Sequence, residues 1–301
     1  MTVGTIEWTD ATWNPVTGCS KVSPGCEHCY AERIALRFNP QGKPWTAPYA
    51  AENVQLHYDR LMVPLRWRKP RRVFVNSMSD LFHAQVPMEP RVWDDPRALP
   101  DIPFLDRVFT VMALTPRHTY QILTKRPERA RAYLTSRAEG MVFTDYAWRL
   151  NFGMVGGAHT RFYRPSLPHP VPWPLANVWV GVSVEDQRRA HERIPLLLEA
   201  PAALRFLSCE PLLGPLDLTP WLDGLDWVIV GAESGPSARP MDDDWVRQIR
   251  DDCQRAGVAF FFKQRAHRGR KEPLPLLDGR QWQDWPAAAP GLAAEGGTGD
   301  A

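Results

Sequence analysis

The sequence predicts an α/β fold, a partial (β/α)6 TIM-like barrel with parallel strands and inserted loops. Short apolar runs rich in β-branched and aromatic residues are each followed at once by polar residues, as in buried parallel strands. Stretches with helical character separate these runs, so that strand and helix alternate. Right-handed crossovers wind such units into a barrel.

Six predicted strands follow a cysteine-rich segment near the N-terminus, at 73–80, 120–126, 178–186, 204–211, 227–235 and 260–265. The helices are expected at about 29–38, 126–138, 186–199 and 243–256. Each strand run ends in polar residues, and in a barrel the carboxyl ends of parallel strands form the catalytic rim.

The chain is predicted to form one barrel domain over residues 1–286, with insertions at about 40–64 and 139–176. The second insertion interrupts the alternation with Gly, Pro, His and aromatic residues. Residues 287–301 contain few large apolar side chains and are expected to be a disordered tail.

The composition narrows the class of protein. Lysine and arginine (36) nearly balance aspartate and glutamate (34), so the net charge of +2 does not itself indicate nucleic-acid binding. No apolar run reaches the ~18–20 residues that cross a bilayer, and the first residues lack an export pattern. We therefore expect a cytoplasmic protein without membrane contact, and the sequence sets no oligomeric state.

Three of the five cysteines, Cys19, Cys26 and Cys29, have the spacing Cys-x6-Cys-x2-Cys. Clustered thiols of this kind hold a metal more often than a disulfide. A closed zinc site needs four ligands, whereas an iron–sulfur cluster with three thiolates keeps one iron open. The alternatives are a zinc site completed by His28 or His83, and plain buried thiols.

The three-cysteine loop resembles that of radical S-adenosylmethionine enzymes, in which it leaves the first strand of an α/β barrel. The usual spacing there is Cys-x3-Cys-x2-Cys, from which this chain departs as some outlying members do. Residues 4–286, with WNP, NSMSDLF, LTKRPE and GAESG, are similar to a phage and bacterial family related to these enzymes. The segment 124–126 also resembles spore photoproduct lyase.

The resemblance implies that Cys19, Cys26 and Cys29 hold a [4Fe–4S] cluster whose open iron binds S-adenosylmethionine. An electron from a cellular one-electron reductant would then cleave S-adenosylmethionine to a 5′-deoxyadenosyl radical, which abstracts hydrogen from the substrate. In that family an aromatic residue just before the third cysteine contacts the adenine of the cofactor. His28 occupies this position here, and Tyr30, just after Cys29, is the predicted cofactor contact.

The remaining predicted cofactor contacts follow three strands. Ser77 and Asp80 would accept hydrogen bonds from the methionyl ammonium, although Asp80 also suits a helix cap. Lys125 would pair with the methionyl carboxylate, or be a solvated surface charge. Ser183 and Glu185 would contact the ribose hydroxyls.

Three residues are predicted to be catalytic at the same rim, namely Cys209, Glu210 and Glu233. The Cys209 thiol would return a hydrogen atom to the product radical; the alternative is a small buried core residue. A rival interpretation is a cofactor-independent hydrolase that uses Glu185, Glu210 and Glu233.

Basic clusters at 66–72 and 263–271 make a nucleotide or nucleic acid the candidate substrate, because Arg and Lys bind phosphates and tryptophans stack on bases. The tryptophans in question are Trp45, Trp67 and Trp173. A second rival is a zinc-binding nucleic-acid-interaction protein without radical chemistry. In that case the basic clusters would carry the function.

Overall fold

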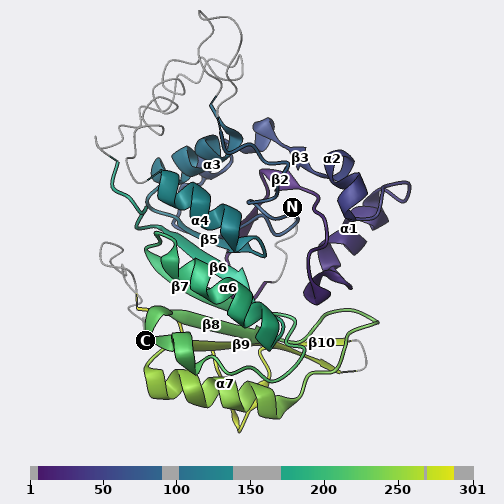
Figure 1. The fold of residues 1–301 in the computed structure, drawn as a ribbon, viewed down its shortest axis with the longest axis vertical. Helices are drawn as coiled ribbons and strands as arrows, with labels where there is room; N and C mark the ends of the chain where they lie inside the picture. Colours follow the sequence, from purple (N-terminus) through teal and green to yellow (C-terminus); the bar gives the residue numbers. More distant parts are fainter. Residues whose placement is uncertain (1–5, 90–101, 138–170, 268–269, 288–301) are drawn as a thin grey trace, which may run out of the picture.

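The computed structural model describes residues 6–89, 102–137, 171–267 and 270–287, and its centre is an eight-stranded sheet that curls into part of a barrel (Figure 1). The strand order is β1-β4-β5-β6-β7-β8-β9-β10. All neighbours are parallel except β9 and β10, which are antiparallel. The strands are β1 (Ala11–Trp13), β4 (Arg72–Val75), β5 (Thr119–Thr124), β6 (Val178–Ser183), β7 (Leu204–Cys209), β8 (Trp227–Gly231), β9 (Ala259–His267) and β10 (Arg270–Pro273).

Helices connect the parallel strands on the outside of the curl. The α-helices are α1 (Tyr30–Phe38), α2 (Ala50–Asn53), α3 (Phe104–Ala113), α4 (Pro127–Ser136), α6 (Gln187–Glu199) and α7 (Asp243–Ala256). Two of them begin at an aspartate whose side chain accepts a hydrogen bond from the first turn, Asp186 for α6 and Asp242 for α7. Gly257 ends α7 in a left-handed conformation.

The predicted fold class is confirmed, since the six predicted strands are β4 to β9 and the four predicted helices are α1, α4, α6 and α7. Three elements were not predicted from the sequence. They are the three-residue strand β1, the exposed polar strand β10 and the largely buried helix α3. The predicted insertion at 40–64 contains short elements, among them α2 and the strand β3 (Gln55–Leu56), which pairs with β2 (Val16–Thr17). Most of the predicted insertion at 139–176 and of the predicted tail lies outside the described residues. Within the described ranges, no helix has the length and apolar character to cross a membrane.

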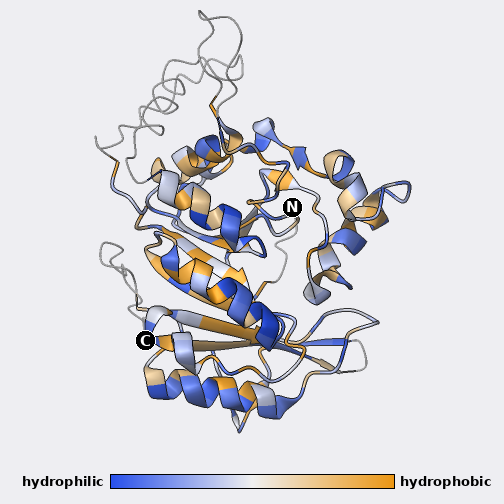
Figure 2. Cartoon of the chain, in the orientation of Figure 1, coloured by the Kyte–Doolittle hydropathy of each residue, from blue (hydrophilic) through white to orange (hydrophobic). Residues whose placement is uncertain are grey.

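Alternation along the strands divides the core into two layers. On β7, Leu207 and Cys209 face the helices, whereas Leu204 and Phe206 face the inside of the curl. Figure 2 shows the polar residues of α6 and α7 on their outer sides. The inner layer is rich in aromatic residues and consists of Trp8, Phe74, Trp179, Leu204, Phe206, Trp227, Ile229 and Phe261. It fills the inside of the curl, and a cavity lies beside it near the carboxyl ends of the strands.

A glycine on β6 permits this aromatic filling. A Cβ atom at Gly181 would lie 2.6 Å from the ring of Phe206, closer than side chains approach one another. The ring of Phe206 in turn lies 5.9 Å from that of Trp227. The small residue on β6 therefore makes room for a large one on β7.

Candidate functional site

The cysteine loop runs from β2 to the start of α1. Cys19 follows β2, Cys26 ends a 3-10 turn (Pro24–Cys26), and Cys29 is the N-terminal cap of α1. All three are free thiols of intermediate exposure. Gly18 has φ +81°, and a Cβ there would lie 1.8 Å from the carbonyl oxygen of Asn53, so only glycine fits this bend.

The three cysteines line one cavity of about 140 Å³, together with residues from the ends of β4, β5 and β6. A larger cavity of about 290 Å³ adjoins it along the carboxyl ends of β4 to β9. The two share Cys29, Tyr30, Phe74, Leu123, Lys125 and Ser183. The fold thus brings the cysteine loop next to a cavity at the rim where barrel enzymes bind their substrates.

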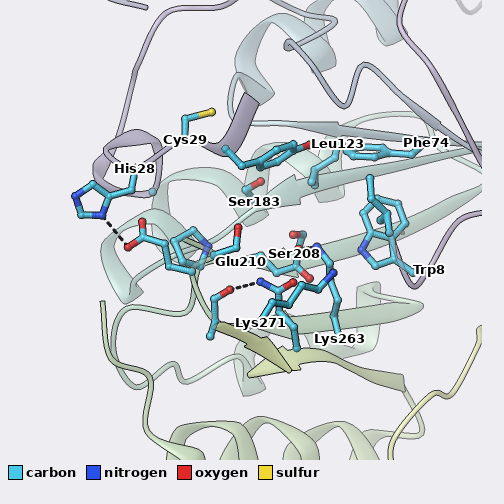
Figure 3. A pocket seen from close by; sticks show the side chains of 18 of the residues that line it. Trp8, His28, Cys29, Phe74, Leu123, Ser183, Ser208, Glu210, Lys263 and Lys271 are labelled. Carbon is cyan, nitrogen blue, oxygen red and sulfur yellow. Dashed lines mark hydrogen bonds and ion pairs between the residues drawn. The ribbon is translucent and has the colours of Figure 1, made fainter. Parts of the chain in front are cut away.

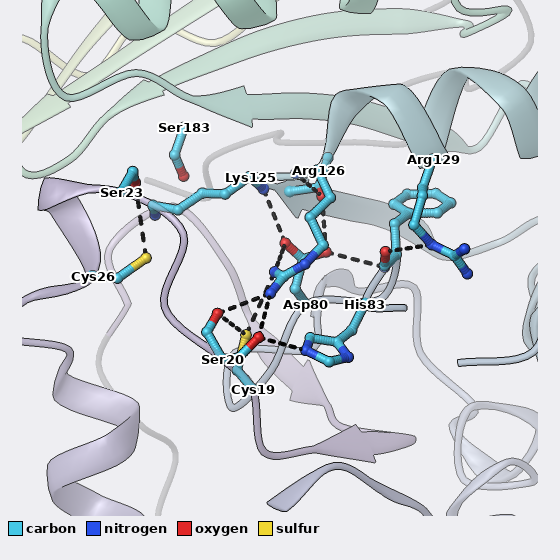
Figure 4. Close-up of polar contacts among 12 residues, drawn as sticks. Cys19, Ser20, Ser23, Cys26, Asp80, His83, Lys125, Arg126, Arg129 and Ser183 are labelled. Atoms are coloured by element: carbon cyan, nitrogen blue, oxygen red, sulfur yellow. Dashed lines mark hydrogen bonds and ion pairs between the residues drawn. The ribbon is translucent and has the colours of Figure 1, made fainter. Parts of the chain in front are cut away.

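Arg126, at the end of β5, connects the sheet to the cysteine loop. Its Nη1 lies 2.9 Å from Asp80 Oδ2 and 3.5 Å from Cys19 Sγ, and its Nη2 donates to the carbonyl oxygen of Ser20 at 2.8 Å (Figure 4). Burial alone would raise the pKa of Asp80, but the guanidinium of Arg126 and several hydrogen bonds lower it. Arg126 and the ionised Asp80 therefore form a buried pair against Cys19.

Asp80 is occupied by groups of the protein itself. Besides Arg126, it accepts hydrogen bonds from Thr124 Oγ1 at 2.8 Å and from the backbone N–H of Lys125 at 3.0 Å. Phe82 N also donates to it, at 3.0 Å. The structure thus gives Asp80 a positioning role within this network, rather than leaving its oxygens open for a ligand.

The protonation of the cysteines depends on their burial. Burial raises the pKa of Cys19 to about 11, against the opposing effect of Arg126, and burial also raises the pKa of Cys29. Without a metal these groups are therefore neutral thiols at neutral pH. A bound metal deprotonates a coordinating thiol, because its charge outweighs the desolvation that burial imposes.

The three thiols line a volume and do not converge on one point. Within the described part of the chain, no group of three or more His, Cys, Asp and Glu side chains is arranged to hold one metal ion. Each thiolate of a [4Fe–4S] cluster binds a different iron, so its ligands surround a volume instead of converging on a point. The smaller cavity supplies such a volume. The buried Asn76 also lines it, and its Nδ2 has no hydrogen-bond partner.

Both histidines considered as a fourth zinc ligand have other partners. His28 Nδ1 is hydrogen-bonded to Glu233 Oε2 at 3.0 Å. His83 Nε2 is hydrogen-bonded to Ser20 Oγ at 2.9 Å, and its Nδ1 accepts from the backbone N–H of Gln85 at 3.1 Å. A zinc ion bound by His83 would require one of its two contacts to break, whereas His28 could ligate through Nε2 with its Nδ1 contact to Glu233 intact.

Glu185 is fully buried and anchors the loop to β6. It pairs with Arg193 at 2.9 Å and accepts a hydrogen bond from the backbone N–H of Gly25 at 3.2 Å. Burial opposes its ionisation, but Arg193 and then Lys125 lower the pKa of Glu185. Ser183, two residues earlier, lines both cavities, so of the two residues predicted to contact ribose only Ser183 lies at the cavity wall.

The other predicted cofactor contacts lie around the smaller cavity. Tyr30 donates from its hydroxyl to the carbonyl oxygen of Ser77 at 2.6 Å. Ser77 Oγ is hydrogen-bonded to the side chain of Asn14 at 3.2 Å. Tyr30 and Lys125 line both cavities, which places them where a ligand spanning the two would pass.

The two predicted catalytic glutamates both line the larger cavity. Glu233 Oε2 binds His28 and Arg239 Nε, the latter at 2.9 Å. Although burial alone would raise it, these hydrogen bonds, with Arg239 contributing most, lower the pKa of Glu233 to about 2. Glu210 Oε2 lies 2.7 Å from Lys263 Nζ, while its Oε1 has no partner.

Cys209 does not line either cavity. Its fully buried thiol packs in the layer between β7 and the helices, and burial raises the pKa of Cys209 far above its usual range. The neighbouring Ser208 faces the larger cavity instead. This placement corresponds to the alternative of a core residue, and it separates Cys209 from any ligand in the cavity.

Several residues of the larger cavity were not predicted from the sequence, chiefly Trp8, Phe74 and Ser208. The alternation along the strand at 204–211 puts Ser208 and Cys209 on opposite faces of β7, but it does not say which face meets the cavity. Lys263 and Lys271 lay within a predicted basic cluster. Trp8 precedes the first strand, and no local pattern marks it.

The two basic clusters lie in different parts of the fold. Residues 66–72 lead into the amino end of β4, where Arg72 pairs with Asp10 at 2.7 Å and stacks on Trp285. The described part of 263–271 includes Lys263 and Lys271 at the larger cavity. Of the three tryptophans considered for base stacking, Trp45 lines the cysteine cavity, whereas Trp67 and Trp173 pack against the core.

These features define an α/β partial-barrel protein with a three-cysteine loop beside a cavity at the carboxyl ends of its strands. The chain belongs to the family described as "Protein of unknown function (DUF5131)", which matches residues 3–286. No curated protein and no solved structure matches the chain.

Proposed function

We propose that the protein is a radical S-adenosylmethionine enzyme. Cys19, Cys26 and Cys29 would hold a [4Fe–4S] cluster, and a cellular one-electron reductant would supply the electron. Such a cluster supplies the reducing electron that cleaves S-adenosylmethionine to the 5′-deoxyadenosyl radical, which abstracts hydrogen from a substrate. The candidate substrate is a nucleotide or a nucleic acid.

The observation that carries this proposal is the junction of the two cavities. Three free thiols from one loop surround the smaller cavity, and Cys29 also lines the larger cavity at the strand ends. A cofactor bound at the cysteines would therefore reach into a space large enough for a second molecule. The aromatic inner layer contributes Trp8 and Phe74 to one wall of that space.

The residues around the junction would divide into two groups by their contacts. Tyr30, Lys125 and Ser183 line both cavities and are suited to contact the cofactor, with Lys125 as the cation for a carboxylate. Asp80 and Glu185 are engaged with Arg126 and Arg193, so they would position the loop without touching the cofactor.

The test is electron paramagnetic resonance of protein purified without oxygen and reconstituted with iron and sulfide. We expect a [4Fe–4S]⁺ signal in the reduced protein and a change in that signal when S-adenosylmethionine is added. Cys26→Ala should abolish the signal. Cys253→Ala, which removes a buried thiol of α7 that lines neither cavity, should retain it.

A different result would favour a rival function. Colourless protein that binds zinc stoichiometrically and forms no cluster would overturn the proposal and support a zinc-binding nucleic-acid-interaction protein. A cluster signal unaffected by S-adenosylmethionine would leave an iron–sulfur protein without the proposed chemistry. Activity that survives replacement of all three cysteines would support the cofactor-independent hydrolase.

A further inference from the structure

The larger cavity has two ends with different chemistry. Figure 3 shows Cys29 and His28 on one side and Trp8 and Phe74 on the other. The part lined by Trp8, Phe74, Ser208, Glu210 and Lys263 is named the distal end; of these residues only Phe74 also lines the cysteine cavity. Its walls come from β4, β7 and β9 and from the segment before β1.

The distal end contains three polar atoms without a hydrogen-bond partner. Trp8 is 1% exposed and its Nε1 is unpaired; Ser208 is also 1% exposed and its Oγ is unpaired. Glu210 Oε1 is unpaired as well, although Oε2 of the same carboxylate binds Lys263 at 2.7 Å. Buried polar groups are almost always paired. Unpaired atoms also occur away from the cavity, as at Trp179 Nε1, but these three belong to residues that line the same end of it, where a ligand would be the missing partner.

The types of these atoms restrict the ligand. An indole N–H only donates, an ionised carboxylate only accepts, and a hydroxyl does both. The ligand must therefore offer at least one acceptor and at least one donor. The rings of Trp8 and Phe74, with centroids 4.5 Å apart, make the adjoining wall aromatic, which favours a planar ligand.

We propose that the distal end binds a nucleobase. A base is planar, and its edge carries hydrogen-bond donors and acceptors in the plane of the ring. A phosphate or carboxylate alone would leave Glu210 Oε1 without a donor, and a benzene-type ring would leave Trp8 Nε1 without an acceptor. Enzymes that act on single bases recognise them by this combination of stacking and edge hydrogen bonds.

The rest of the cavity suits the remainder of a nucleotide. Three lysines line it: Lys263 pairs with Glu210, Lys271 pairs with Glu7 at 2.6 Å, and Lys125 stands beside the cysteine cavity. The ammonium groups of Lys263 and Lys271 are the cations that a phosphate at this end would meet. A volume of about 290 Å³ has room for a small molecule, so a nucleic acid would have to present one extruded base. The claim that the bound nucleotide is the substrate rests on the proposed function. The claim that a nucleotide binds in this cavity does not.

The test is isothermal titration calorimetry, which needs no cluster and can therefore succeed or fail independently of the radical chemistry. The probes are UMP, CMP, AMP and GMP, a short single-stranded oligonucleotide of mixed sequence, and ribose 5-phosphate. We expect at least one mononucleotide or the oligonucleotide to bind and ribose 5-phosphate not to bind. Binding of mononucleotides would indicate a free nucleotide, and binding of the oligonucleotide alone an extruded base.

Two variants connect the binding to the unpaired atoms. Trp8→Phe keeps an aromatic ring but removes the N–H, and should weaken binding about tenfold, as expected for one buried hydrogen bond. Ser208→Ala breaks no hydrogen bond within the protein and should also weaken it. Trp179→Phe is the matched control, since Trp179 is buried with an unpaired Nε1 but does not line the cavity, and it should leave affinity unchanged.

Four results would overturn the proposal. These are no binding by any base-containing probe, equal binding of ribose 5-phosphate, equal losses in Trp8→Phe and Trp179→Phe, and unchanged affinity in both Trp8→Phe and Ser208→Ala. Binding of AMP alone that S-adenosylmethionine abolishes would also overturn it, because that result would locate the adenine of the cofactor instead.

Discussion

Arg126 and Asp80 form a buried ion pair 2.9 Å long between the ends of β4 and β5, and the same guanidinium lies against Cys19 Sγ. Asp80 follows β4 and Arg126 follows β5, so the pair also ties two neighbouring strands together. Because Arg126 further binds the carbonyl oxygen of Ser20, the position of Cys19 depends on this pair.

Replacing Arg126 by Gln should destabilise the protein by about 3–5 kcal/mol, because it leaves the carboxylate of Asp80 buried without its partner. Urea unfolding followed by circular dichroism would measure the loss. Arg131→Gln is the control, since Arg131 pairs with Glu199 at the surface and such pairs contribute about 1 kcal/mol or less. Equal losses in the two variants would contradict the importance of the buried pair.

His83 should make stability depend on pH in a defined window. Burial and the nearby Arg126 lower the pKa of His83 from 6.5 to about 4. Between pH 6.5 and about 4 the unfolded chain therefore binds a proton that the folded chain does not, so the free energy of unfolding decreases as the pH falls. The structural reason is that protonation of Nδ1 would break the hydrogen bond from Gln85.

His83→Gln should reduce this pH dependence by about 2–3 kcal/mol across the window. Urea unfolding at a series of pH values measures it. His191→Gln, which replaces an exposed histidine of α6, should leave the slope as it is in the parent protein. An unaltered slope in His83→Gln would show that His83 titrates normally in the folded protein.

Gly181→Ala should destabilise the protein by about 1–3 kcal/mol, because the added methyl group would overlap the ring of Phe206 inside the barrel. Gly214→Ala is the matched control, since nothing lies within 4 Å of a Cβ at that position. Thermal unfolding of the two variants provides the comparison. A fully tolerated Gly181→Ala would mean that the aromatic inner layer packs more loosely than the structure indicates.

Cys209→Ala should reduce stability by about 1 kcal/mol through the loss of a small buried group, and should leave any cluster signal and its response to S-adenosylmethionine unchanged. Urea unfolding and electron paramagnetic resonance on the same preparation measure both. Loss of the response at unchanged stability would restore Cys209 as a functional residue.

The sequence was sufficient to predict the strands of the sheet that are buried on both faces. The strands β4 to β9 are short apolar runs with polar ends, and burial of both sheet faces produces that pattern directly. The strand β1 was not predicted because three residues are too few to show an alternating pattern. The helix α3 escaped because it is buried almost all round, which gives it an apolar run like that of a strand.

The candidate site was predictable where its residues follow strands or cluster in the chain, as the cysteines, Glu210 and Glu233 do. It was not predictable where tertiary contacts decide. Trp8 reaches the cavity from before β1, held by a hydrogen bond from Gln121 to its carbonyl oxygen. Cys209 and Ser208 both lie at the end of β7, but their side chains point to opposite faces of the strand. Their position at the strand end does not reveal that Ser208 is the one facing the cavity.

The anchors of the cysteine loop have a consequence for how the protein matures. The loop is fastened by Ser20 to Arg126, by Gly25 to Glu185 and by His28 to Glu233, contacts that span 106, 160 and 205 residues of sequence. An N-terminal segment emerging from the ribosome gains Arg126 after β5 and Glu185 after β6, and it lacks Glu233 until synthesis has passed β8. The three thiols therefore complete their arrangement only late in synthesis, and assembly of the proposed cluster would require a nearly finished chain.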